Sequence, residues 1–290
     1  MKDDERNPSA ELWVKPLRDP LHPAVSRQMR QMNQFRRTMD NWVFRSVHYH
    51  EIGEKQLVME AIQGRALREL LARAGGPFAT VQARDFARQL AGLAGAWLGH
   101  FHKWKPARKP KTYDTGSVVE LALDKIGLLS KAGLPEGLAN RIRSALEEGS
   151  RETPDNLVVM LHGDFKPSNL MVTDNQMVGV DMEGHGWGHP LIDLGSFIAA
   201  CTTLRSSALL GSHCPQWWRL VCSEFLLGYE SVNEWSRAGL GMQVLKNVLA
   251  LFEYMRCRHT YLLWWLRGRP LMVRTLAELL DAPLLETQGT

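Results

Sequence analysis

Apolar and polar positions alternate differently in the first and second parts of the chain. Residues 11–17 (ELWVKPL) have the composition of a short strand, and residues 24–39 carry apolar side chains at helical spacing. Two further β-rich runs, residues 42–50 and 55–62, flank a turn at Gly53, which predicts an antiparallel hairpin. The first part therefore predicts a small lobe of strands and one helix.

Helical spacing dominates from residue 64 onward. The clearest amphipathic pattern recurs every three or four positions at Phe86, Leu90, Leu93, Trp97 and Phe101. Predicted helices cover residues 65–74, 80–102, 117–131 and 135–150, and two short β-type runs at 157–161 and 176–181 precede a helical remainder that ends near Asp281. The sequence thus predicts an α+β fold with a small N-terminal lobe over residues 1–63 and a large, mainly helical C-terminal lobe over residues 64–290.

The composition predicts a folded chain that does not span a membrane. Its 290 residues are 44% hydrophobic, enough for a sizeable core. The charged N-terminal segment lacks the apolar run of a signal peptide, and the apolar stretch 261–266 is far shorter than the about 20 residues of a membrane-spanning helix. Four cysteines without CxxC spacing favour a reducing cytoplasm over a disulfide or zinc framework. The net charge of +4 comes from scattered lysines and arginines, so no nucleic-acid partner is expected.

Two segments concentrate polar residues with chemical capacity: residues 161–172 (LHGDFKPSNLMV) and residues 178–195 (VGVDMEGHGWGHPLIDLG). Together they resemble the catalytic loop and the metal-binding segment of the aminoglycoside phosphotransferase and choline kinase branch of the protein-kinase-like fold. The matching residues are His162-Gly163-Asp164, Asn169, Asp181, Pro190 and Asp193. The resemblance implies a bilobal kinase fold and an enzyme that transfers a phosphoryl group from ATP, or GTP, with Mg²⁺.

The resemblance also implies a role for each polar residue. Asp164 would accept or orient the proton of the substrate hydroxyl, and Lys166 would reach the transferred phosphate. Asn169 and Asp181 would hold magnesium through oxygen ligands, with Glu183 in support. As an alternative, Asp164 could be a loop aspartate that caps a turn, and Asn169 a turn amide bonded to its own backbone.

A zinc site is a second possibility for the same region. His185 and His189 could join Asp181 and Glu183 as ligands, but glycines interrupt the segment and favour a flexible loop over a rigid ligand shell. By the resemblance, His162, His102 and Asp193 have structural roles, Asp193 by tying the catalytic loop to the following helix.

The nucleotide side of the site is predicted further upstream. Residues 57–71 (LVMEAIQGRALRELL) resemble the family's hinge, so adenine would pair with backbone groups near Glu60, Ala61 and Ile62; the alternative is an ordinary strand-to-helix connection. Lys15 is the candidate for the nucleotide-binding lysine, the alternative being a surface lysine.

The small lobe departs from the family pattern. Residues 24–39 contain no acidic partner for Lys15, only fourteen residues precede that lysine, and the first glycine is Gly53. Two strands of about five residues and a glycine-rich loop do not fit into that leader. We therefore expect a truncated small lobe that lacks the glycine-rich loop.

These observations predict a kinase that phosphorylates a hydroxyl of a small molecule. The alternatives are a pseudokinase or nucleotide-binding regulatory protein without transfer activity, and an unrelated helical binding protein. From Gly184 to the C-terminus the sequence has eight acidic and nine basic residues, which favours a neutral or anionic acceptor, such as a sugar or glycolipid precursor, over a polycation. The tryptophan-rich C-terminal region is predicted to be helical core with snorkelling arginines, in preference to a lipid-facing or dimer-forming patch.

Overall fold

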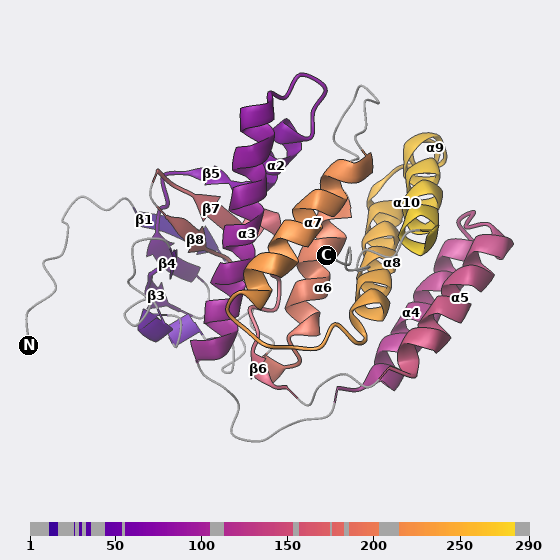
Figure 1. The fold of residues 1–290 in the computed structure, drawn as a ribbon, viewed down its shortest axis with the longest axis horizontal. Helices are drawn as coiled ribbons and strands as arrows, with labels where there is room; N and C mark the ends of the chain where they lie inside the picture. Colours follow the sequence, from indigo (N-terminus) through magenta and orange to yellow (C-terminus); the bar gives the residue numbers. More distant parts are fainter. Residues whose placement is uncertain are drawn as a thin grey trace, which may run out of the picture.

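A bank of helices lies beside a group of short strands in the computed structural model (Figure 1). The structure describes residues 12–16, 26, 29–30, 33–35, 44–53, 56–104, 113–152, 157–174, 176–182, 186–202 and 215–281. In that part of the chain, no helix is both long enough and apolar enough to cross a membrane.

The N-terminal strands form an antiparallel sheet in the order β1-β4-β3. β1 (Leu12–Pro16) places Lys15 opposite Leu57 of β4 (Gln56–Glu60). β3 (Tyr49–Ile52) pairs with the other edge of β4, so the predicted hairpin around Gly53 is confirmed. Alternate side chains of β4, Leu57 and Met59, are buried, which fixes the face that the sheet turns to the core.

The beginning of the predicted run 42–50 belongs to a different sheet, which corrects the prediction of one continuous hairpin strand. β2 (Phe44–Ser46) pairs in parallel with β8 (Met177–Gly179), and the Val47 N–H donates to the Gly179 carbonyl at 2.9 Å. The second sheet has the order β2-β8-β7-β5, with β7 at Leu170–Val172 and β5 at Arg65–Ala66. Sequence periodicity does not reveal this pairing, because its partner lies more than a hundred residues away.

The predicted helix at residues 24–39 is described only in part. Ser26, Met29, Arg30 and residues 33–35 are helical, and the remainder lies outside the described residues. The Asn33 side chain holds the backbone of Tyr49, donating to its carbonyl at 2.7 Å and accepting from its N–H at 2.9 Å. Phe35 is buried against the ring of Phe101. These contacts join the helical residues to both the sheet and the large lobe.

Helices make up most of the remaining chain, as the periodicity predicts. They are α2 (Leu67–Ala74), α3 (Val81–Trp104), α4 (Thr115–Ser130), α5 (Glu136–Ser150), α6 (Leu191–Thr202), α7 (Pro215–Glu230), α8 (Leu240–Arg258), α9 (Tyr261–Leu263), the π-helical turn η3 (Trp264–Gly268) and α10 (Arg269–Asp281). Two short strands, β6 (Val159–Met160) and β9 (Trp187–Gly188), pair antiparallel beside the predicted catalytic loop. Cys201 and Cys222 are buried free thiols, and Cys257 is an exposed one.

Helix α3, which lies next to the strands in Figure 1, packs against α7. Their backbones approach so closely that a Cβ atom on Gly228 would lie 1.9 Å from the Gly92 carbonyl oxygen. On the same helix α3, Trp97 is buried, whereas Phe86 and Leu93 are exposed. The apolar stripe predicted for α3 is therefore narrower than its spacing indicates, because only the side facing α7 and the predicted catalytic loop is covered.

Candidate active site

Residues 162–164 form a tight loop whose backbone N–H groups donate to the carboxylate of Asp193. Gly163 has φ of 87°, a left-handed conformation that favours glycine. The buried Asp193, in the first turn of α6, accepts the His162 N–H at 2.7 Å and the Gly163 N–H at 2.9 Å. This loop lies between β6 and η1 (Pro167–Asn169), so α6 directly positions Asp164.

Asp193 is also part of a buried polar chain that reaches α7. The Nε2 atom of His102, on α3, lies 3.1 Å from Asp193, and its Nδ1 lies 3.0 Å from the Tyr229 hydroxyl. Burial by itself would raise the pKa of Asp193, but the hydrogen bond and charge of His102, with help from His162, lower it below the ordinary value. Asp193 is therefore ionised at neutral pH, and three elements meet at its carboxylate.

The His162 ring is buried under the loop between aromatic side chains. Its centroid lies 5.4 Å from Phe165 and 6.1 Å from Trp97. Burial lowers the pKa of His162, and nearby carboxylates oppose that shift; they belong to Asp193, Asp164 and Asp181. A buried ring with a lowered pKa is uncharged at neutral pH, which fits a packing role.

Asp164, Lys166 and Asn169 form one hydrogen-bonded group. The Asn169 Nδ2 atom donates to the Asp164 carbonyl at 2.9 Å and to its carboxylate at 3.0 Å. The Lys166 ammonium donates to the same carboxylate. The Asn169 carbonyl accepts the Val180 N–H at 2.9 Å, so this group is joined by backbone to the residue before Asp181.

Asp181 occupies a backbone conformation that is rare for its type. Its φ is 56°, and among the described residues it is the one non-glycine residue with positive φ. Asp and Asn tolerate this region better than most side chains, and such residues concentrate at functional sites. The Asp181 carboxylate pairs with the Lys15 ammonium of β1, and both side chains are partly exposed. The predicted nucleotide lysine and the predicted metal ligand are therefore neighbours, although 166 residues separate them.

The residues present fit a magnesium ion. Because the Asn169 nitrogen is directed to Asp164, its Oδ1 is the atom that could bind a cation; from the described part of the chain, the Ser168 hydroxyl donates to it at 3.3 Å. That oxygen and the Asp181 carboxylate are hard donors of the kind Mg²⁺ prefers. Glu183 lies outside the described residues, as does His185.

The described part of the chain does not support the alternative of a zinc site. No group of three or more His, Cys, Asp or Glu side chains is placed there to hold a metal ion. The buried His189 instead packs against Tyr113, with the ring centroids 4.8 Å apart and the rings tilted by 49°, and its Nδ1 accepts the Leu191 N–H at 3.3 Å.

Glu60, the first predicted hinge residue, is the last residue of β4. It lies opposite Leu12 of β1, the strand that also carries Lys15. Its N–H already donates to the His48 carbonyl at 3.0 Å. Ala61 and Ile62 follow in non-repetitive backbone before β5. Lys15 of β1 lies opposite Leu57, three positions before Glu60 on the neighbouring strand β4.

A cavity of about 620 Å³ opens beside Asp164 and Lys166; it is called the polar cavity here for its charged residues, and apolar side chains such as Leu251 and Met255 line it as well. Its other polar lining residues are Arg68, Ser168, Ser196, Asn247 and Tyr254. The sequence motifs single out neither Arg68 nor Ser196. A signal existed for Ser196, because it is a polar residue in the otherwise apolar run LGSFIAA of α6.

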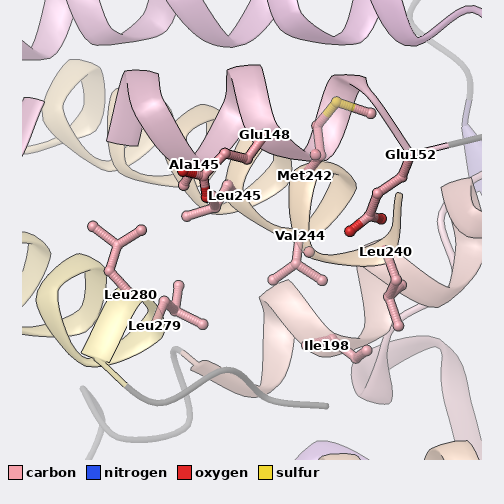
Figure 2. Close-up of a pocket in the computed structure, with 12 residues that line it drawn as sticks. Ala145, Glu148, Glu152, Ile198, Leu240, Met242, Val244, Leu245, Leu279 and Leu280 are labelled. Carbon is pink, nitrogen blue, oxygen red and sulfur yellow. The ribbon is translucent and has the colours of Figure 1, made fainter. Parts of the chain in front are cut away.

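Figure 2 shows a different and smaller cavity, of about 230 Å³, between α5, α8 and α10. Aliphatic side chains such as Leu245, Leu279 and Leu280 line most of it. The Glu152 carboxylate at its edge accepts the Gly239 N–H and so caps the start of α8. No residue of the 161–172 loop lines this cavity.

A small mixed lobe, a helical lobe and this arrangement of Asp164, Asn169, Asp181 and Lys15 define a kinase-type phosphotransferase. The sequence model of the phosphotransferase enzyme family (APH) matches residues 15–213, which is more than half of the chain. The chain belongs to that family, as its sequence motifs predict. A comparison with curated proteins found no match.

Solved kinases share the fold at low sequence identity. A glucosamine kinase in complex with glucosamine, ADP and inorganic phosphate has a TM-score of 0.57 and 15% identity, covering 93% of this chain and 72% of that one. An amicoumacin kinase in complex with AMP-PNP and Ca²⁺ has a TM-score of 0.57 and 12% identity, covering 96% and 84%. A choline/ethanolamine kinase family protein from Mesorhizobium loti has a TM-score of 0.53 and 16% identity, covering 96% and 83%. These likenesses confirm the predicted bilobal α+β fold.

Proposed function

We propose that this protein transfers the γ-phosphoryl group of ATP or GTP, with Mg²⁺, to a hydroxyl of a neutral or anionic small molecule in the cytoplasm. The observation that carries the proposal is the position of Asp164, hydrogen-bonded to Asn169 and facing a polar cavity. A hydroxyl bound in that cavity would meet a carboxylate able to take its proton on one side and the phosphate on the other.

The charges of the site suit a magnesium–nucleotide complex. Asp164 and Asp181 supply two negative charges, and Lys166 and Lys15 supply two positive ones. The two ammonium groups can turn toward phosphate oxygens, while the carboxylates remain for the metal and the acceptor. Such a site neutralises the charge that develops during transfer without holding a large excess of either sign beforehand.

In this proposal, Asn169 Oδ1 and Asp181 bind Mg²⁺, and Glu183 completes or supports its coordination. When bound, the metal neutralises phosphate charge and fixes the phosphoryl group for in-line attack. Asp181, whose backbone is left-handed, forms an ion pair with Lys15 of β1. Adenine would pair with backbone groups near Glu60, Ala61 and Ile62, and the Glu60 N–H donates to the His48 carbonyl.

The acceptor class follows from the lining of the cavity. Besides Asp164, its charged residues are two cations, Arg68 and Lys166, and the remaining polar groups are hydroxyls and one amide. A polycation would meet like charges there, whereas a polyol or an anionic sugar would find hydrogen-bond donors. A sugar or a glycolipid precursor therefore suits the cavity better than an aminoglycoside.

Two substitutions separate metal binding from chemistry. Asp181→Asn keeps a residue that tolerates positive φ but removes the anionic ligand, so magnesium-dependent nucleotide binding measured by calorimetry should be lost. Asp164→Asn should bind Mg-ATP as the wild type does while lowering transfer by about 10²-fold or more.

The acceptor panel for these assays contains amino sugars, neutral sugars, sugar phosphates and glycolipids. A wild-type chain that binds Mg-nucleotide but phosphorylates no member of the panel is a pseudokinase. A wild-type chain that binds no nucleotide refutes the proposal altogether.

A further inference from the structure

A run of apolar side chains that follows α8 faces outward, whereas Trp217, Trp218 and Trp264 are buried, as predicted for this tryptophan-rich region. The exposed fractions are 79% for Tyr261, 65% for Leu262, 66% for Leu266 and 38% for Trp265. Leu263 is exposed as well. These residues occupy α9 and the following π-helical turn, which lie beside α10 in Figure 1. A contiguous exposed apolar patch of this kind indicates an interaction surface.

The backbone of this patch is anchored, so the exposure is built into the fold. Trp264, next to the exposed Trp265, is buried and donates its Nε1–H to the Ala132 carbonyl at 2.9 Å. The Arg269 guanidinium donates to the Gly133 carbonyl at 2.8 Å and lies 4.9 Å from the Trp265 ring. The turn between α4 and α5 therefore accepts hydrogen bonds from Trp264 and Arg269, which lie on either side of Trp265 in the sequence.

Positive charge surrounds the apolar side chains. From Tyr254 to Ala277 the sequence contains no Asp or Glu, and its five arginines are Arg256, Arg258, Arg267, Arg269 and Arg274. Arg258 stacks 5.0 Å from the ring of Tyr254, which also lines the polar cavity. Exposed leucine, tryptophan and tyrosine flanked by arginine is the combination that binds the interface of an anionic bilayer.

We propose that residues 254–269, hereafter the docking surface, bind the surface of an anionic lipid bilayer. The apolar side chains enter the headgroup region, and the arginines pair with lipid phosphates. Residues 254–269 contain four arginines and no Asp or Glu, which favours this occupant over a second copy of the chain, because two such surfaces would repel each other. Docking holds the Tyr254 side of the cavity at the headgroups, which suits a glycolipid acceptor; this consequence alone rests on the proposed function.

The test is flotation of the full chain with vesicles. The wild type should bind mixed phosphatidylcholine–phosphatidylglycerol vesicles, bind phosphatidylcholine vesicles much less, and lose binding as salt rises. The double variant Leu262→Ser and Leu266→Ser should partition about tenfold or more weakly. As a matched control, Phe78→Ser and Val81→Ser remove exposed apolar side chains at the start of α3 and should leave partitioning unchanged.

A charge variant, Arg258→Gln with Arg267→Gln, should abolish the preference for anionic vesicles. Failure of the wild type to float, or equal flotation of the leucine variant, overturns the proposal. So does a wild-type dimer that the leucine variant converts to a monomer in sedimentation velocity, because the surface is then a dimer interface. Mg-nucleotide binding is measured on the same samples: its retention with failed flotation refutes docking only, and its absence with normal flotation refutes the kinase proposal only.

Discussion

Asp193→Asn tests how the catalytic loop is held. The substitution keeps the size of the side chain but removes its charge and one of its two acceptor oxygens. In the folded protein one oxygen accepts from the His162 N–H and His102, and the other accepts from the Gly163 N–H. Whichever way the amide turns, its NH₂ group faces at least one backbone N–H.

The expected cost follows from this count of contacts. At least one hydrogen bond to a charged acceptor is lost, and at least one buried donor is left without a partner. Each of these terms is worth about 1.5–3 kcal/mol, and partial relaxation of the loop reduces their sum, so we expect Asp193→Asn to lower the free energy of unfolding by about 2–4 kcal/mol.

Urea denaturation followed by tryptophan fluorescence and by circular dichroism measures this loss. The matched control is Asp181→Asn, the same chemical change at a partly exposed ion pair, which should cost about 1 kcal/mol or less. A free energy of unfolding for Asp193→Asn within about 0.5 kcal/mol of the wild type would show that the buried carboxylate does not hold the loop.

Two further predictions concern packing and pH. Gly228→Ala should lower the free energy of unfolding by about 1–3 kcal/mol in the same urea assay, because the new methyl group would meet the Gly92 carbonyl. The control Gly127→Ala, in open space on α4, should instead raise the free energy of unfolding by up to about 1 kcal/mol. Equal effects of the two substitutions would refute the close contact. The pKa of His162 is lowered in the folded protein, so the unfolded chain binds a proton more readily. The contribution of the neutral ring to the free energy of unfolding is therefore complete above about pH 6.5 and falls below it by up to about 1.4 kcal/mol per pH unit. In urea titrations from pH 7 to pH 5, the free energy of unfolding should decline less steeply for His162→Phe than for the wild type, and parallel curves would contradict this assignment.

The residues of the loop and the metal segment could be recognised from the sequence because their spacing is short. Asp164, Lys166 and Asn169 lie within six positions, and the local turn that brings them together is encoded by those positions themselves. Helices such as α4 and α5 were also predictable, since a buried stripe recurs at the helical period over several turns. The resemblance to the phosphotransferase family rests on these local patterns.

Contacts between distant segments were decided only by the tertiary structure. The parallel pairing of β2 with β8 and the contribution of Arg68 to the polar cavity depend on how sheets and helices pack, which no local period records. The C-terminal region also shows that local sequence does not determine burial, because Trp264 and Trp265 are adjacent in the sequence and yet differ in exposure. Packing on the α4–α5 turn buries Trp264 and leaves Trp265 facing outward. Composition determines that this region is apolar and basic, but only the packing of neighbouring helices decides which side chains remain to meet a partner.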